Sequence, residues 1–331
     1  MKCAILGASG FIGSNLVRAA LARGWQVRAI DRNPPRAAQD PSPAFTAIRA
    51  DLFDLDSLLT AMRGTDVVFH AAAPYPITSF GWQKGVEAAR VSASNVIEAQ
   101  RRSGAPRLIY TSSLVTIGRP VGAATLADET VPYNLRGVWS PYFEQKVVME
   151  GLLLQAARDG TPIVVVNPTF CFGPFDTKPA RQVLLRVARG QMPFYPEVPV
   201  NAVDVRDVAE GQMLAAERGV PGERYLLGGR NVMFSEILAA VAQAAGVRPP
   251  RWRLPLWLGR SAALLSEVVS RIVGSAPAVP LVGMELLKHS QHVTWRKAES
   301  QLGYKPRYPF DQTFADAVAW LRESGRLPRS S

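Results

Sequence analysis

Tyr142 and Lys146 are spaced for proton transfer at a single ligand. They lie four residues apart in a segment that is predicted to be helical from about Tyr142 to Arg158, so both side chains leave the same face of the helix. Tyrosine is a weak acid, and a neighbouring ammonium is expected to lower the pKa of its phenol toward the working range. We therefore predict that Tyr142 is the general acid and base, and that Lys146 supports it and can also hydrogen-bond hydroxyl groups of a bound ligand.

Hydroxyl groups stand at the end of a second predicted element, the strand Arg107–Ser112. Ligands bind at the carboxyl ends of the strands of a parallel sheet, and Thr111, Ser112 and Ser113 occupy such an end. Ser113 is our choice for polarising a substrate oxygen. Ser112 is the alternative and an expected substrate contact, while Thr111 is expected beside the cofactor. A serine pair that only forms a turn is the interpretation without function.

A glycine-rich turn near the N-terminus predicts the cofactor. A strand over Met1–Leu6 leads into this turn, and a helix follows from Phe11 to about Arg23. The glycines permit a tight turn and let backbone N–H groups approach a pyrophosphate at the helix N-terminus. The residues predicted to bind the pyrophosphate are Gly7, Ser9, Gly10, Phe11, Ile12 and Gly13.

Asp31 and Arg32 bear on the choice of dinucleotide. Asp31 ends the second predicted strand, Trp25–Ile30, and lies about 20 residues past the glycine turn, where an acidic residue binds the ribose diol. A carboxylate at this position favours NAD, whereas Arg32 is placed to bind the 2′-phosphate of NADP. We predict NAD, with NADP as the alternative.

Strand and helix signals alternate through the first half of the chain. Short apolar runs at Asp66–His70 and Pro162–Val166 lie on either side of the strand Arg107–Ser112, and a helix is expected from about Gln83 to Ser103. Such alternation predicts parallel βαβ units, and an uninterrupted apolar strand is typical of a sheet that is covered on both faces. The predicted fold class is α/β, a Rossmann-type doubly wound parallel sheet with a smaller, mostly helical C-terminal substrate region.

Prolines after Asn167 mark the expected start of that smaller region. Residues 1–167 are predicted to form the dinucleotide-binding domain, with residues 199–220 returning to it. Residues 168–198 and 221–331 are predicted to form the substrate-binding region. The elements expected there are helices near Arg181–Arg189 and Phe234–Ala245 and a strand at Arg224–Leu227.

The composition favours a globular enzyme over other classes of protein. The formal net charge of +11 is spread over scattered arginines without a dense basic run, so nucleic acid is not expected as a partner. Cys3 and Cys171 give neither a disulfide framework nor metal-ligand spacing, so we expect two buried thiols and no metal. The start of the chain does not have the pattern of a signal peptide, and we expect a cytoplasmic protein with a small-molecule substrate.

The segment 254–274 is largely apolar but contains charged residues. Arg260, Glu267 and Arg271 interrupt it, which argues against a stable membrane span. Three roles are open for this segment. It can cover an apolar substrate pocket, make peripheral contact with a membrane as an amphipathic helix, or simply pack in the core.

Five motifs follow one another in order along the chain. They are Gly7–Gly13, His70–Ala73, Thr111–Ser113, Tyr142–Lys146, and Asn167-Pro168 followed by Gly173-Pro174. Over essentially the whole chain these motifs resemble the extended short-chain dehydrogenase/reductases, the NAD-dependent epimerase/dehydratase family. The resemblance implies a catalytic set of Ser113, Tyr142 and Lys146. It also implies the cofactor contacts Asp51 and Leu52 beside the adenine, Ala71, Ala72 and Ala73 along the cofactor, and Pro168 near the nicotinamide.

Within that family the chain is most similar to dihydroflavonol-reductase-like proteins and to bacterial hopanoid-associated sugar epimerases, judging from Asn167–Pro179. Nucleotide-sugar epimerases of the family have Arg-Pro and a later asparagine where this chain has Asn167-Pro168 and Phe170, which argues against a nucleotide-sugar substrate. Sugar dehydratases have Asp-Glu in place of Leu114-Val115, which argues against dehydration. Thr169 and Phe170 are the expected substrate contacts.

The leading hypothesis is an NAD(P)-dependent oxidoreductase that interconverts a secondary alcohol and a ketone on a small, fairly apolar substrate. The alternative enzyme is an NAD-dependent epimerase of a sugar or sugar nucleotide, which would use the same three residues. A non-catalytic nucleotide-binding sensor or scaffold is the alternative from another class, because fold does not settle function. The long helices near Gln83 and Tyr142 offer the contact of a homodimer.

Overall fold

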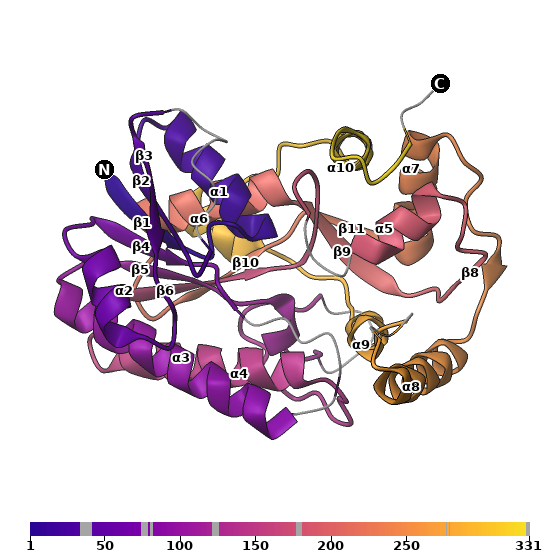
Figure 1. Cartoon of the computed structure of the whole chain (residues 1–331), viewed down its shortest axis with the longest axis horizontal. Coiled ribbons are helices and arrows are strands. Elements are labelled where there is room, and N and C mark those ends of the chain that lie inside the picture. Colours follow the sequence, from indigo (N-terminus) through magenta and orange to yellow (C-terminus); the bar gives the residue numbers. More distant parts are fainter. Residues whose placement is uncertain are drawn as a thin grey trace.

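Seven parallel strands form the main sheet of the computed structural model, which describes residues 1–33, 42–73, 79, 82–120, 126–176, 181–275, 277 and 279–328. The strand order is β10-β6-β5-β4-β1-β2-β3, and every neighbouring pair is parallel (Figure 1). The direction of winding reverses beside β1, so the predicted doubly wound sheet is confirmed. The strands are β1 (Lys2–Leu6), β2 (Gln26–Asp31), β3 (Phe45–Arg49), β4 (Val67–His70), β5 (Leu108–Thr111), β6 (Ile163–Pro168) and β10 (Arg224–Leu227).

Helices cover both faces of this sheet. One face carries α1 (Phe11–Ala22) and α6 (Val205–Arg218), which pack against each other. The opposite face carries α2 (Leu55–Met62), α3 (Trp82–Ser103) and α4 (Pro141–Arg158), as Figure 1 shows. The two helices expected near Gln83 and Tyr142 therefore lie side by side on one face, and they begin one residue earlier than the sequence pattern predicts.

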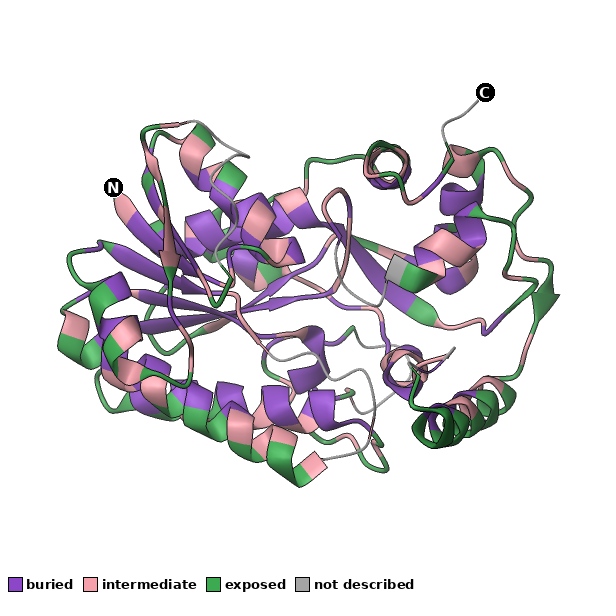
Figure 2. Cartoon of the chain, in the orientation of Figure 1, coloured by how far each residue is buried: buried purple, intermediate pink, exposed green. Residues whose placement is uncertain are grey.

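The side chains of β1 show how one strand serves two cores. Cys3 and Ile5 are buried in the core beneath α1 and α6, whereas Ala4 and Leu6 are buried in the core beneath α2, α3 and α4. Successive side chains of a strand point to opposite faces of the sheet, so a strand covered on both sides must be apolar throughout. This explains the uninterrupted apolar runs in the sequence, and Figure 2 shows the central strands buried along their length.

The smaller region contains two short sheets and five helices among its described residues (Figure 1). A core of its own holds α5, α7 and α10 together, with Val200 and Val232 from the larger of the two sheets. The three-stranded sheet has the order β11-β9-β7, from β7 (Phe170–Phe172), β9 (Pro199–Asp204) and β11 (Arg230–Met233), and β8 (Phe194–Tyr195) pairs with β12 (Trp252–Arg253). The helices are α5 (Arg181–Ala188), α7 (Phe234–Ala245), α8 (Leu256–Val273), α9 (Leu281–Lys288) and α10 (Phe310–Glu323).

Two strands lie in different sheets from those expected. Residues 199–220 were predicted to return to the main sheet. Within this range α6 packs on the main sheet, but β9 pairs with β7 and β11 in the smaller sheet. Conversely, β10 was expected in the smaller region but pairs with β6 at the edge of the main sheet. A short apolar strand fits either sheet by composition, so its partner is decided by tertiary packing. The division of the chain into two domains stays a prediction.

Candidate active site

The glycine turn between β1 and α1 is built for close backbone approach. Gly7 has φ +83°, and a Cβ on it would lie 2.7 Å from the backbone of Ala72. A Cβ on Gly13 would lie 2.0 Å from the carbonyl oxygen of Gly7. Helix α1 begins at Phe11 with no side-chain cap on its N-terminus. The backbone N–H groups of an uncapped helix N-terminus, approached past glycines without side chains, suit the pyrophosphate of a dinucleotide.

Asp31 ends β2 next to this turn and is held there by backbone donors. Its carboxylate accepts a hydrogen bond from the Ser9 N–H at 3.2 Å and another from the Arg32 N–H at 2.8 Å. Both Asp31 and Arg32 line the cavity described below. Ser9 does not line it, because its side chain is exposed and donates to the carbonyl of Asn33 at 3.4 Å. The Ser9 N–H thus helps to orient Asp31, and the predicted contact of Ser9 with the cofactor stays a prediction.

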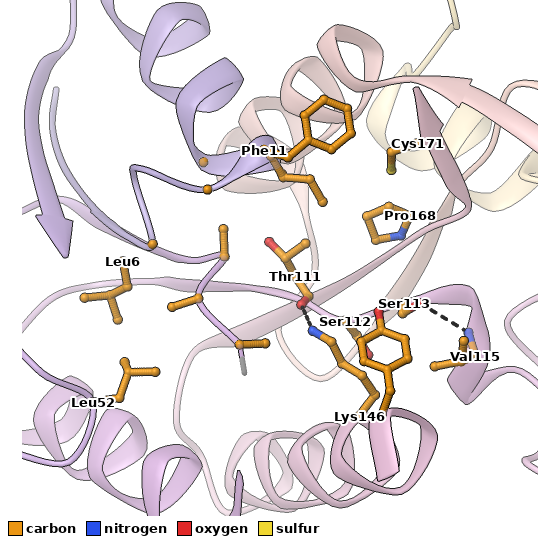
Figure 3. A pocket seen from close by; sticks show the side chains of 18 of the residues that line it. Leu6, Phe11, Leu52, Thr111, Ser112, Ser113, Val115, Lys146, Pro168 and Cys171 are labelled. Atoms are coloured by element: carbon orange, nitrogen blue, oxygen red, sulfur yellow. Dashed lines mark hydrogen bonds between the residues drawn. The ribbon is translucent and has the colours of Figure 1, made fainter. Parts of the chain in front are cut away.

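One cavity of about 410 Å³ runs from the glycine turn to the end of β6. It brings together every other residue that the sequence predicts for the site (Figure 3). The predicted residues in its wall are Gly7, Gly10, Phe11, Ile12, Gly13, Asp31, Arg32, Asp51, Leu52, Ala71, Ala72, Ala73, Thr111, Ser112, Ser113, Tyr142, Lys146, Pro168, Thr169 and Phe170. The stretch Asn167–Pro179, which carries the resemblance within the family, is described as far as Asp176, and residues 177–179 lie outside the described part of the chain.

Lys146 is buried, and the end of β5 positions its ammonium. The Nζ atom donates a hydrogen bond to the carbonyl oxygen of Thr111 at 2.9 Å, and the dashed line in Figure 3 marks this bond. Nζ also lies 5.2 Å from the centre of the Tyr110 ring. The side chain from α4 is therefore fixed against the same strand end that delivers the hydroxyl groups of Thr111, Ser112 and Ser113.

The pKa of Tyr142 differs from the sequence-based expectation. Burial raises it to about 12, the hydrogen bond with Ser113 lowers it, and Cys171 contributes a smaller increase. The expectation that Lys146 brings the phenol toward the working range is wrong for the protein alone, because desolvation outweighs the other effects. Tyr142 is consequently protonated at neutral pH.

Ser113 forms a turn and also lies beside Tyr142. It caps the short 3₁₀ helix Leu114–Thr116, accepting a hydrogen bond from the Val115 N–H at 3.4 Å (Figure 3). It also hydrogen-bonds Tyr142. The turn thus fixes the serine hydroxyl beside the phenol, and the structural and functional interpretations of this serine are compatible.

Several wall residues could not be found from sequence spacing. Leu286 and His289 reach the cavity from α9 and the residue after it, and Phe143 and Leu184 come from α4 and α5. Leu184, Leu286 and His289 belong to no recognisable motif, because only packing brings residues so distant in sequence to the cavity. Phe143 lies within the Tyr142–Lys146 motif, but its spacing did not single it out as a wall residue. Cys171 also lines the cavity; it lies in β7 and is half-buried, whereas a buried loop thiol was expected.

The doubly wound sheet, the glycine turn with Asp31, and the Ser113–Tyr142–Lys146 set define an enzyme of the extended short-chain dehydrogenase/reductase class. The chain belongs to the NAD dependent epimerase/dehydratase family, whose model matches residues 3–228. The predicted family, enzyme class and NAD cofactor are thereby confirmed.

Relatives of this chain have been given different activities. A protein of Synechocystis with the provisional name dihydroflavonol 4-reductase is 36% identical over 97% of this chain and 94% of its own length. Sterol demethylase protein B of Methylococcus capsulatus is 31% identical over 99% of this chain and 100% of its own length. Among solved structures, a nucleoside-diphosphate-sugar epimerase from Pseudomonas aeruginosa has a TM-score of 0.82 at 25% identity, covering 98% of this chain and 99% of that one.

Proposed function

We propose that this protein is an NAD(P)-dependent oxidoreductase that interconverts a secondary alcohol and a ketone on an apolar substrate. The observation that carries this proposal is the meeting of Ser113, Tyr142 and Lys146 with the glycine turn in one cavity. A proton donor, a hydroxyl that holds the substrate oxygen and a dinucleotide site are the parts that a ketone reduction needs.

The residues at the turn fit a dinucleotide. Gly7 and Gly13 leave room where any Cβ would collide with backbone, and the uncapped N-terminus of α1 suits a pyrophosphate. Asp31 would accept hydrogen bonds from a ribose diol, and Lys146 would donate to the hydroxyls of the second ribose. A bound nicotinamide supplies or accepts the hydride. Asp51 and Leu52 would lie beside the adenine, and Pro168 beside the nicotinamide.

The protein supplies the proton and holds the substrate oxygen. With a pKa of about 12, the phenol of Tyr142 is protonated at neutral pH and can donate to an alkoxide that forms at the substrate carbon. Ser113, fixed by its bond with the Val115 N–H, would donate to the same oxygen. Reduction would use Tyr142 in its protonated form, and oxidation of an alcohol would require the phenol to give up this proton first.

The chemistry of the wall favours an apolar substrate over a sugar nucleotide. The cavity wall includes the large apolar side chains Phe143, Phe170, Phe172, Leu184 and Leu286, together with the polar residues Thr169 and Asp176. Among the described wall residues the basic side chains are Arg32, Lys146 and His289, and the first two belong to the dinucleotide end. Paired cations commonly bind a diphosphate, and apart from Arg32 and Lys146 the described wall offers His289 as its basic side chain. The sterol in the name of the Methylococcus relative is consistent with a large apolar substrate.

The experiment that tests this proposal begins with the nucleotide content of the purified protein. The protein is denatured, and any released nucleotide is identified and counted per chain. An empty protein that binds NADH or NADPH reversibly and reduces steroid or other alicyclic ketones supports the proposal. Near-stoichiometric tightly held NAD, with no net oxidation or reduction, supports the epimerase alternative. Nucleotide binding without turnover of any substrate supports the sensor alternative.

A further inference from the structure

Helix α8 turns its polar residues inward and its apolar residues outward. Its buried residues are Ala263, Glu267 and Ser270. Large apolar side chains cover the opposite side, which is the exposed stretch of helix at the lower right of Figure 2. We call this surface the α8 face; it consists of Trp257, Leu264, Leu265, Val268, Val269 and Ile272, of which Trp257 and Leu265 are 64% exposed and Ile272 is 80% exposed.

This inverted orientation is fixed by hydrogen bonds. The buried carboxylate of Glu267 accepts from the Ser79 N–H at 3.1 Å and from the Leu281 N–H at 3.0 Å, at the start of α9. Arg260 pairs with Glu285 of α9 at 2.7 Å. Rotating α8 to bury its apolar side would break these bonds and leave Glu267 without its donors. The bonds of Glu267 and Arg260 therefore hold the apolar side of α8 at the surface of the protein.

The surroundings of the α8 face are basic. Residues 247–284 contain five arginines and one acidic residue, the buried Glu267, and one of these arginines, Arg260, is paired with Glu285 of α9. Arg251 and Arg253 are exposed on either side of the exposed Trp252, directly before α8. Arg253 forms a salt bridge with Glu197 at 3.3 Å. An apolar helix face with tryptophan and flanking arginines has the chemistry of an interfacial helix that binds anionic lipid.

A second copy of this chain fits the same surface less well. A second copy carries the same arginines around its α8 face and therefore offers no complementary negative charge. A bilayer with anionic headgroups instead complements both the apolar side chains and the arginines. No helix in the described part of the chain is long and apolar enough to cross a membrane, so α8 would lie in the plane of the interface.

The opposite, buried side of α8 faces the part of the protein that carries the cavity. Helix α9 packs against α8, and Leu286 of α9 together with His289 lines the cavity. We propose that the α8 face docks on the surface of membranes that contain anionic phospholipids, with α8 and α9 lying between the bilayer and the cavity. This docking is separate from the proposed reaction. It can be tested by measuring membrane binding, which requires no turnover of a substrate.

The test is binding of the full-length protein to lipid vesicles. Vesicles of phosphatidylcholine alone are compared with vesicles of phosphatidylcholine and phosphatidylglycerol in equal parts, and bound protein is measured by flotation. We expect binding to the anionic vesicles that weakens as salt rises and falls about tenfold or more in Leu265→Glu and in Ile272→Glu. Val220→Glu, which alters a side chain that is 51% exposed on the loop after α6, is the matched control and should bind like the unmodified protein.

A second measurement does not depend on how well the charged variants fold. Lipids brominated in the upper acyl chain should quench the tryptophan fluorescence of the bound protein, and this quenching should fall in Trp257→Phe and fall further when Trp252 is also replaced by Phe. Failure of the unmodified protein to bind anionic vesicles, or equal binding by Leu265→Glu, would overturn the proposal. So would light scattering that shows a dimer which Leu265→Glu dissociates, because the second copy would then be the occupant.

Discussion

The side-chain amide of Asn167 donates to the buried carboxylate of Glu150 at 2.7 Å. The same amide nitrogen lies 3.2 Å from the carbonyl oxygen of Ser113, and Glu150 also pairs with Arg224 at 2.9 Å. Asn167 is fully buried and does not line the cavity. Its position at the end of β6 thus ties the segment that carries Ser113 to α4, the helix that carries Tyr142 and Lys146.

Replacing Asn167 by leucine should weaken both the fold and the site. Glu150 would lose a buried donor, and we expect the free energy of unfolding to fall by about 1–3 kcal/mol. Because Ser113 would lose an anchor, kcat should fall more than the affinity for the dinucleotide. Denaturant unfolding and steady-state kinetics measure the two effects, and Gln243→Leu, at an exposed amide of α7, is the control. Unchanged kcat in a stable Asn167→Leu protein would show that the anchor does not position Ser113.

Replacing Tyr142 by phenylalanine should abolish most of the turnover and leave dinucleotide binding nearly intact. The ring is kept and only the proton donor is removed, so kcat should fall by about 10²–10⁴-fold. Titration of cofactor fluorescence measures binding, and loss of NADH absorbance measures turnover. Tyr133→Phe, at a tyrosine that is 38% exposed and outside the cavity wall, should behave as the unmodified protein does. An unchanged rate in Tyr142→Phe would refute the assigned proton donor.

Asp31→Ala should relax the discrimination between NAD and NADP. The carboxylate would repel a 2′-phosphate, and its removal leaves Arg32 beside the space. We expect the ratio of kcat/KM for the two cofactors to move toward NADP by about tenfold or more, which corresponds to one lost charge interaction. Asp56→Ala, at an exposed acidic residue of α2, controls for the change in net charge. A ratio that stays constant would assign the discrimination to other residues.

His70 should make the stability of the fold depend on pH. Burial, and secondarily the charge of Lys146, lower the pKa of its imidazole from 6.5 to about 3. Between these values the unfolded chain binds one more proton than the folded protein, so stability rises with pH. The contribution is fully present above about pH 6.5 and is lost as the pH falls toward 3.

The measurement compares the unmodified protein with His70→Gln, which cannot titrate. The difference in the free energy of unfolding between the two should shrink as the pH is lowered from neutrality to about 4.5. Taking this difference cancels the titration of all other groups that the substitution leaves alone. A difference that is constant over this range would mean that His70 is charged or solvated in the folded protein.

The sequence predicts the dinucleotide end of the site better than the substrate end. Gly7, Asp31 and Tyr142 can be recognised because local geometry, a turn, a strand end or one helix face, sets their spacing. Leu286 and His289 are different, since only the packing of α9 brings them to the cavity. The partner of β10 was equally hidden, because its four residues do not reveal which sheet they join.

The inverted orientation of α8 shows another limit of pattern analysis. The segment is amphipathic, and amphipathicity normally predicts that the apolar side is buried. Here the buried donors to Glu267 decide the orientation, and they come from Ser79 and Leu281, which no local pattern links to α8. The sequence left three roles open for this segment, because its pattern does not decide which face of the helix meets the protein.

Gly7→Ala should separate a requirement for close approach from a requirement for unusual backbone geometry. Gly7 and Gly24 both have positive φ, +83° and +72°, so alanine at either position is strained by about 1 kcal/mol. At Gly24 nothing lies within 4 Å of the added Cβ, whereas at Gly7 the Cβ would lie 2.7 Å from the backbone of Ala72. We expect Gly24→Ala to lose only the strain energy and to bind NADH normally. Gly7→Ala should lose more stability and most of its NADH affinity, as measured by denaturant unfolding and fluorescence titration. Equal losses in the two variants would mean that the turn yields to a side chain and that β1 and β4 do not hold it in contact with Ala72.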